Sequence, residues 1–176
     1  YNINMLRTTS ECMSAILGGS DTISNISYDS VYHKSNEFGE RIARNQLLIL
    51  QKEAYLSEAQ NFANGSYYIE NIERQFAEKA LEVFKQIEEN GGFLKQLKNG
   101  SIQKKIYENT QKQQDQFDQD KITLLGTNKL PDLNERMKQE LQIYPFLKTK
   151  NSKTLIAPIL QRRISEKNEM IRLKKE

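Results

Sequence analysis

The chain has 176 residues, of which 37% are hydrophobic and 28% charged, and its formal net charge is +3. No run of about 18 apolar residues occurs, which excludes a membrane-spanning helix, and the one cysteine, Cys12, excludes an internal disulfide and indicates a reducing, cytoplasmic compartment. Even with the 8 glycines added, the hydrophobic share stays below the roughly 45–50% of globular domains. Together with a start at Tyr1 rather than Met, this predicts a fragment that belongs to a larger assembly.

Apolar residues at helical spacing predict a first helix over residues 2–17. The next segment, residues 20–29, is short and rich in Ser, Thr and Ile, and is predicted to be a strand. Ser35 or Asn36 would cap a second helix over residues 37–56, in which apolar residues again repeat with a helical period. This second helix is expected to be half buried.

The most regular helical pattern lies at residues 71–90, after a loop in which Gly65 is expected to take a positive φ. Its apolar residues fall at spacings of three and four without a gap. They are Ile69, Ile72, Phe76, Ala80, Val83, Phe84 and Ile87. We therefore expect this helix to be the main buried element and to pack against the helix over residues 37–56.

The second half of the chain is less apolar. Residues 101–116 predict a polar helix that can bury a narrow stripe, and residues 121–125 predict a short buried strand. From Pro158, a residue suited to a first helical turn, a thin apolar seam predicts a helical tail. The order of elements indicates an α/β fold with too few strands to close a sheet, as expected for part of a larger α/β layer.

The positive charge is concentrated at the end of the chain. Residues 148–176 carry nine Lys or Arg and three Glu, a net charge of +6 that leaves −3 for residues 1–147. A basic tail of this kind can contact nucleic acid or an acidic protein surface. A solvated helix face is the preferred interpretation, because Glu166 and Glu169 interrupt the positive charges and no aromatic residue is interleaved for base stacking.

Sequence signatures of catalysis are absent. The chain has no phosphate-binding Gly-rich loop, no G-x-G-x-x-G and no G-x-S-x-G motif. One Cys and one His exclude a zinc site built from those ligands, so no catalytic or metal-binding residue is assigned. Cys12 and His33 are disfavoured as a nucleophile and its base. Cys12 lies beside Met13 on an apolar helix, where burial explains it, and His33 lies in a polar turn.

Two clusters stand out from the rest of the sequence. Residues 41–46 place two arginines and an asparagine on neighbouring helical positions, which can contact an anion without specificity. Residues 65–70 read Gly-Ser-Tyr-Tyr-Ile-Glu and predict a tight turn that presents two phenols.

These clusters carry a resemblance to a known family. Four strings resemble the methylmalonyl-CoA mutase family in order and spacing, over about residues 2–133: NMLRTTSECMSAILGG, RIARNQLLILQKE, GSYYIENIERQFAEKALEVFKQIEENGGF and ITLLGTNKLPD. The resemblance implies the C-terminal portion of an eight-stranded β/α (TIM-type) barrel, mostly helical in this fragment with few short strands. It also implies adenosylcobalamin as cofactor and an acyl-coenzyme A ester as substrate. Residues 1–133 would belong to the barrel domain, and residues 134–176 would form a basic, partly helical tail.

Two departures from the family pattern concern catalysis. Catalytic chains of the family carry His, Gln and a second His at and after the first Gly-Gly turn, where this chain has Gly19, Asp21 and Ser24. The family's cobalamin-binding loop, Asp-x-His-x-x-Gly, does not occur in this sequence. The chain therefore looks like part of the small, non-catalytic subunit of a heterodimeric mutase. The large subunit would bind most of the cofactor and interconvert methylmalonyl-CoA and succinyl-CoA.

Three residues near the RIARN string keep the family's identities, namely Asn45, Gln51 and Glu53. The resemblance implies cofactor contacts for them, since a carboxylate or amide oxygen accepts hydrogen bonds from ribose hydroxyls, although polar capping of the helix end is the simpler explanation. Two other functions stay open. One is a catalytically competent chain whose active-site groups lie in a missing N-terminal half. The other is an unrelated helical interaction module with a nucleic-acid-binding tail.

Overall fold

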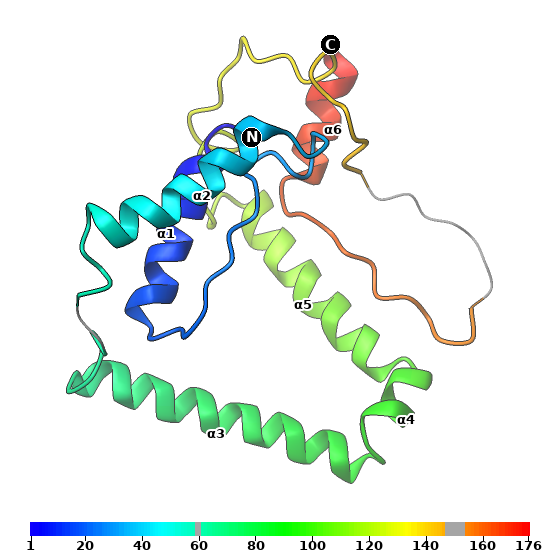
Figure 1. Cartoon of the computed structure of the whole chain (residues 1–176). Coiled ribbons are helices and arrows are strands. Elements are labelled where there is room, and N and C mark those ends of the chain that lie inside the picture. Colours follow the sequence, from blue (N-terminus) through cyan, green and yellow to red (C-terminus); the bar gives the residue numbers. More distant parts are fainter. Residues whose placement is uncertain (59–60, 147–153) are drawn as a thin grey trace. The chain divides into compact units, whose positions relative to one another are not determined.

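The structure, a computed structural model, describes residues 1–58, 61–146 and 154–176 (Figure 1). The described residues form six α-helices and two compact units. Unit 1 comprises Tyr1–Glu73 and Met137–Pro145, and unit 2 comprises Arg74–Arg136 and Phe146–Glu176. None of the helices in the described ranges has a stretch long and apolar enough to cross a membrane.

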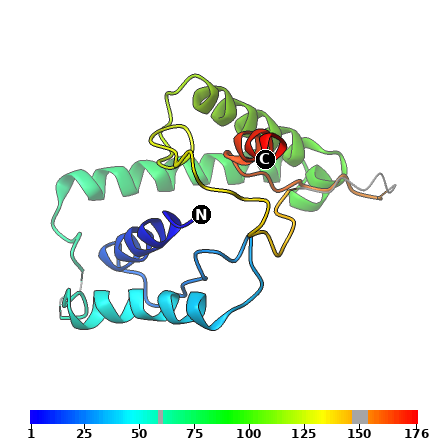
Figure 2. The same cartoon turned by 90° about the horizontal axis from the view of Figure 1, so that it is seen from above.

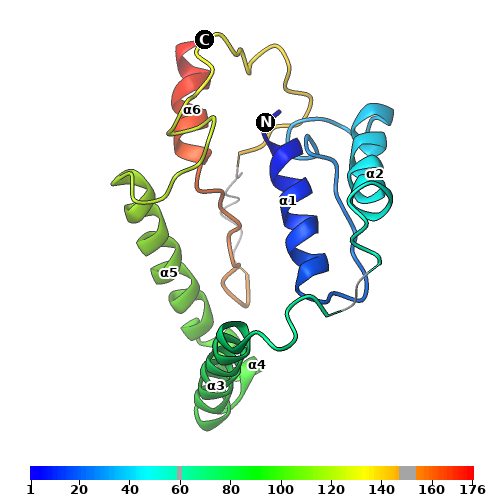
Figure 3. The same cartoon turned by 90° about the vertical axis from the view of Figure 1, so that its left-hand side faces the viewer.

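Unit 1 is built on two helices that pack side by side, α1 (Asn4–Leu17) and α2 (Glu37–Lys52) (Figures 1 and 3). Both helices were predicted from their apolar periodicity, and both are confirmed. A small apolar core lies between them and the segment that connects them. Its buried residues are Cys12, Tyr32, Ala43 and Leu50.

The ends of the two helices follow from local sequence. α1 ends at a glycine pair in which Gly19 has a φ of +79°, a conformation that glycine adopts at little cost. α2 begins after Asn36, whose Oδ1 accepts the N–H of Gly39 at 2.8 Å, so the predicted cap is confirmed. α2 ends at Lys52, before the predicted residue 56, because Tyr55 has a φ of +55°, outside the helical region.

A segment distant in sequence completes unit 1. The backbone N–H groups of Gln142 and Ile143 both donate to the carbonyl of Tyr32, at 3.0 and 2.9 Å. The N–H of Lys34 donates to Oε1 of Gln142 at 3.1 Å. We call residues 137–145 the strap, because these bonds fasten it across the turn that precedes α2.

The two predicted strands are wrong. Residues 20–29 are irregular chain, and the amide of Asn25 donates to the carbonyl of Ala43 on α2 at 3.1 Å, so contacts with a helix replace a sheet ladder. Residues 121–125 lead into a tight turn with one isolated bridge, and the described ranges contain no strand. A short apolar run indicates burial, but a strand also needs a neighbouring strand to pair its backbone groups. The described chain is therefore mostly helical.

α3 (Tyr67–Glu89) leads into unit 2 and is followed by three shorter helices (Figures 1 and 2). These are α4 (Phe93–Lys98), α5 (Ser101–Asp118) and α6 (Glu166–Lys175). α4 was not predicted, and it packs against α5. α5 itself confirms the predicted polar helix at 101–116. Phe117 and Phe146 are the buried apolar side chains among the described residues of unit 2.

α3 has no buried residue, so the prediction that it is the main buried element is wrong. The side chains of Phe76 and Phe84 are 73% and 58% exposed. Its periodicity places the apolar residues along one side, but that side is buried only where a second surface covers it. Packing of α3 against α2 would join two units and stays a prediction.

The tail helix begins later than predicted, at Glu166, whereas Pro158 lies in irregular chain. Glu169 is buried and accepts hydrogen bonds from both terminal nitrogens of Arg163, at 2.7 and 2.6 Å, and from the hydroxyl of Ser165 at 2.5 Å. These bonds fix the turn before α6 and place an acidic first turn at the helix N-terminus, where the helix dipole favours negative charge.

Candidate functional site

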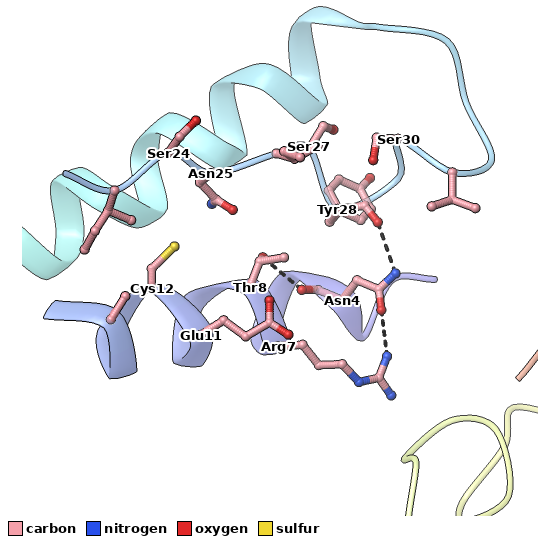
Figure 4. Close-up of a pocket in the computed structure, with 14 residues that line it drawn as sticks. Asn4, Arg7, Thr8, Glu11, Cys12, Ser24, Asn25, Ser27, Tyr28 and Ser30 are labelled. Atoms are coloured by element: carbon pink, nitrogen blue, oxygen red, sulfur yellow. Dashed lines mark hydrogen bonds between the residues drawn. The ribbon is translucent and has the colours of Figure 1, made fainter. Parts of the chain in front are cut away.

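A groove of about 470 Å³ lies in unit 1 between α1 and residues 23–31 (Figure 4). We call it the α1 groove. Its α1 wall carries one cation, Arg7, and one carboxylate, Glu11, and the opposite wall carries serine hydroxyls and the amide of Asn25. Apolar side chains, among them Ile23, Ile26 and Val31, also line the groove, so its surface is part polar and part apolar.

Hydrogen bonds centred on Asn4 connect the two walls of the α1 groove (Figure 4). Nδ2 of Asn4 donates to the carbonyl of Tyr28 at 3.1 Å, and Oδ1 accepts from Nη1 of Arg7 at 2.7 Å. The carbonyl of Asn4 also accepts the hydroxyl of Thr8 at 2.9 Å. One asparagine in the first turn of α1 therefore sets the spacing of the walls and the position of the cation.

The amide of Gln46 joins α1, α2 and the segment between them, and its residue is only 6% exposed. Its Nε2 lies 2.5 Å from the carbonyl of Met5 and 2.9 and 2.8 Å from the hydroxyls of Thr8 and Thr9. Its Oε1 accepts Nδ2 of Asn25 at 2.7 Å. Because an amide nitrogen carries two hydrogens, Nε2 can donate to two of its three neighbours at once. The buried amide is thus fully hydrogen-bonded.

Sequence reasoning missed Gln46, although a signal was present. Gln46 follows Ala43 by three positions and precedes Leu50 by four, which is the spacing of one helix face, and all three residues are buried. A polar residue on a buried face must find hydrogen-bond partners. The spacing alone therefore indicates a buried, partnered amide beside Asn45.

A second network surrounds Asp29, which is 2% exposed. Its carboxylate accepts hydrogen bonds from the hydroxyl of Ser27, from Nδ1 of His33 at 2.9 Å and from Nδ2 of Asn36 at 2.9 Å. Burial raises the pKa of this carboxyl, but the hydrogen bonds outweigh burial and hold the pKa below its usual value. Asp29 is therefore ionised at neutral pH. We call these four residues the Asp29 cluster.

The Asp29 cluster depends on glycine at position 39, in the first turn of α2. Gly39 is buried, and a Cβ at this position would overlap the hydroxyl of Ser27 and lie 2.7 Å from Oδ1 of Asp29. Packed side chains do not approach this closely. The missing side chain lets the carboxylate reach the N-terminus of α2, where the helix dipole favours its charge.

The three residues with predicted cofactor contacts lie outside these networks. Asn45 and Gln51 are exposed on α2, and Glu53 is exposed at its C-cap. At 3.6 residues per turn, Asn45 and Glu53 lie about 80° apart around the helix axis, whereas Gln51 lies about 120° from Asn45 on the other side. Asn45 and Glu53 can face one ligand, and Gln51 faces a different direction.

Cys12 and His33 have different partners. Cys12 is buried, and burial, followed by the charge of Glu11, raises the pKa of its thiol. The thiol therefore stays protonated at neutral pH, which is the inert form. His33 binds Asp29. These contacts favour a structural role for both side chains.

Known proteins are similar in sequence to this chain over most of its length. A model of the family described as methylmalonyl-CoA mutase matches residues 1–173. The chain is 37% identical over 134 residues to the methylmalonyl-CoA mutase small subunit of Porphyromonas gingivalis. The aligned region covers 76% of this chain and 22% of that protein. It is 35% identical over 153 residues to the probable mitochondrial methylmalonyl-CoA mutase of Caenorhabditis elegans. The aligned region covers 87% of this chain and 20% of that protein.

Similarity extends to a bacterial mutase whose name specifies no subunit. The chain is 36% identical over 129 residues to the methylmalonyl-CoA mutase of Escherichia coli, covering 73% of this chain and 18% of that protein. It spans about a fifth of the length of these curated relatives. Because the family model matches almost every residue, the chain belongs to the methylmalonyl-CoA mutase family.

Proposed function

We propose that this chain is part of the small, non-catalytic subunit of a heterodimeric, cytoplasmic methylmalonyl-CoA mutase. In the complex, the large subunit binds adenosylcobalamin and the acyl-CoA ester and interconverts methylmalonyl-CoA and succinyl-CoA. The chain described here contributes interface and stability. Its similarity to a protein named as a small subunit supports this assignment.

The observation that carries the non-catalytic role is the chemistry of the α1 groove. In the places where the resemblance expects Gln and His, the chain has Asp21 and Ser24, both exposed, and Ser24 lines the groove. The chain's one imidazole, His33, is held by the buried carboxylate of Asp29. A serine hydroxyl does not titrate near neutral pH as an imidazole does. These side chains therefore suit a binding or structural role.

We further infer that residues 1–133 come from the C-terminal part of an eight-stranded β/α barrel, with residues 134–176 as its basic tail. The amphipathic helices α2 and α3 are the kind of element that forms the outer ring of such a barrel. The strap lies in the tail range but binds Tyr32 in unit 1. This contact supports placing part of the tail with the barrel portion.

The large subunit holds most of the cofactor in this proposal. Adenosylcobalamin supplies radical chemistry, and the protein supplies binding and orientation. Asn45 and Glu53 share one side of α2 but lie about 12 Å apart along its axis, and Gln51 faces another direction, so one ribose does not fit all three residues. Any contribution of this chain to cofactor binding is therefore small.

Co-purification tests the proposal. The full-length chain that contains these residues should purify with a larger partner, and mutase activity should require both. Alone, it should bind adenosylcobalamin with a Kd above about 10 μM, equivalent to roughly 7 kcal/mol. Tighter binding by this chain alone would instead support the catalytically competent alternative. A salt-sensitive shift with random nucleic acid would support a nucleic-acid-binding tail.

A further inference from the structure

The chain contains three Asn-Gly pairs, at positions 64–65, 90–91 and 99–100. An asparagine loses its side-chain amide most readily when glycine follows it, because a residue without a Cβ leaves its backbone nitrogen open to the asparagine side chain. All three asparagines are exposed, so exposure does not distinguish them. Their hydrogen bonds differ, and this difference decides which of them can react.

Two of the asparagines are held by the helix ends beside them. Nδ2 of Asn90 donates to the carbonyl of Gln86 at 2.6 Å, in the last turn of α3. Oδ1 of Asn99 accepts the backbone N–H of Ser101 at 3.0 Å and its hydroxyl at 2.7 Å, at the start of α5. These bonds must break before either side chain can reach the nitrogen of the next residue.

The first asparagine, Asn64, is not held in this way. Within the described ranges, its side-chain amide makes no hydrogen bond. It lies in a turn in which the N–H of Ser66 donates to the carbonyl of Ala63 at 3.2 Å, and Gly65 has a φ of +79°. The N–H of Gly65 donates to Oε1 of Glu70 at 3.1 Å. The amide of Asn64 is therefore free to rotate, and a carboxylate already contacts the proton that the Gly65 nitrogen must lose.

The acceptor of the glycine N–H also separates this pair from the pair at 90–91. The N–H of Gly91 donates to the backbone carbonyl of Glu88 at 2.9 Å, and a carbonyl does not take up a proton near neutral pH. The carboxylate of Glu70 can take up a proton, and it lies within hydrogen-bond reach of the nitrogen concerned. Its position is therefore that of a general base.

We propose that Asn64 is a site of spontaneous deamidation in which Glu70 acts as the general base. The nitrogen of Gly65 attacks Cγ of Asn64 and passes its proton to the Glu70 carboxylate. The bond between Cγ and Nδ2 then breaks, and the amide nitrogen takes this proton and leaves as ammonia. Water opens the resulting succinimide ring and leaves an aspartate or an isoaspartate at position 64. Water is the only co-reactant.

The modification changes the turn that precedes α3. Both products add a negative charge beside the contact between Gly65 and Glu70, and the isoaspartate also adds a methylene to the backbone immediately before Gly65. We expect this contact to be lost in the isoaspartate form. Because ammonia leaves, the asparagine is not regenerated, and the modified fraction increases with the age of the molecule.

Peptide mass spectrometry of the full-length subunit, incubated at mildly alkaline pH, tests the proposal. Position 64 should lose its amide at least about tenfold faster than positions 90 and 99. Glu70→Gln keeps an oxygen that can accept the Gly65 N–H but removes the base, and it should slow the loss at position 64 by at least about tenfold. Glu73→Gln makes the same change of charge about one turn further along α3 and should leave the rate unchanged.

The urea-unfolded subunit provides the reference, because its hydrogen bonds are lost and the three positions should then react at similar rates. Equal rates at the three positions in the folded subunit would overturn the proposal, since the structure would not select Asn64. An unchanged rate in Glu70→Gln would overturn the role of Glu70 as the base. Circular dichroism of both variants shows that each is folded, so that a change in rate reports on the carboxylate.

Discussion

α2 and α3 are both amphipathic helices, yet one is packed and the other is open. α2 buries Ala43, Gln46 and Leu50 against α1, and a hydrogen-bonded amide lies at the centre of that face. α3 has the longer apolar face and no buried residue. Periodicity determines which side of a helix is apolar, whereas burial requires a matching surface. In unit 1 the hydrogen bonds of the buried Gln46 and Asp29 determine which surface packs against α2.

The largest expected contrast is between a packed and an open apolar residue. Leu50 is 4% exposed, and Leu50→Ala should destabilise the chain by about 2–4 kcal/mol through lost burial and a cavity. Phe84 is 58% exposed, and Phe84→Ala should cost less than about 1 kcal/mol although it removes more atoms. Urea titration of both variants measures the difference. A larger loss for Phe84→Ala would mean that α3 is packed within the chain.

Buried and exposed glutamines give the next contrast. Gln46→Leu should cost about 2–3 kcal/mol, because the amide of Asn25 and the carbonyl of Met5 lose a buried partner. Gln86→Leu makes the same chemical change on the exposed surface of α3 and should alter stability by less than about 0.5 kcal/mol. Thermal denaturation of the two variants compares them. Equal effects would show that the Gln46 network contributes nothing to unit 1.

Gly39→Ala should destabilise the chain by about 1 kcal/mol, which is opposite in sign to the usual effect. Within a helix, Gly to Ala normally stabilises by about 1 kcal/mol. Here the new Cβ would lie 2.7 Å from Oδ1 of Asp29, and overpacking costs about 1–3 kcal/mol. Ser27→Ala removes the other close atom and should recover part of the loss in the double variant. A stabilised Gly39→Ala variant would mean that the Asp29 cluster moves freely.

The smallest expected effect is a pH dependence. The pKa of Asp29 lies below its ordinary value of 3.8, so its ionised form stabilises the fold fully above that value, and this contribution is lost as pH falls through the folded-state pKa. Asp29→Asn should therefore be less stable than the unsubstituted chain near pH 6, and the difference in stability between the two should narrow at about pH 3. Urea titrations at both pH values measure this difference. If this difference in stability widened in acid, the ionised carboxylate of Asp29 would destabilise the fold rather than stabilise it.

The helices were predictable where local spacing and capping decide them. α1, α2 and α5 follow from their periodicity, and the cap at Asn36 follows from the preference of helix N-termini for Ser and Asn. The strands at 20–29 and 121–125 were not predictable, because a strand is defined by a neighbour that a short apolar run does not reveal. Pro158 suits a first turn, but the half-buried Arg163, paired with the buried Glu169, sets the start of α6 through side-chain contacts.

The site was predictable to a smaller degree. Asn45, Gln51 and Glu53 were chosen because they match a family string, and they lie exposed on α2 and its C-cap, facing two directions. The buried Gln46 could have been found from its spacing to Ala43 and Leu50. Asp29 could not, because its partners come together only when the turn before α2 closes.

The strap has a consequence for how the protein is made. Lys34 and Gln142 are separated by 108 positions in the sequence. At about 5–20 residues per second, a ribosome needs roughly 5–20 s to synthesise the intervening chain. During that interval the carbonyl of Tyr32 has neither of its two strap donors. The strap bonds of unit 1 can therefore form only after most of unit 2 has been translated, and forming them closes a long loop, which has an entropic cost.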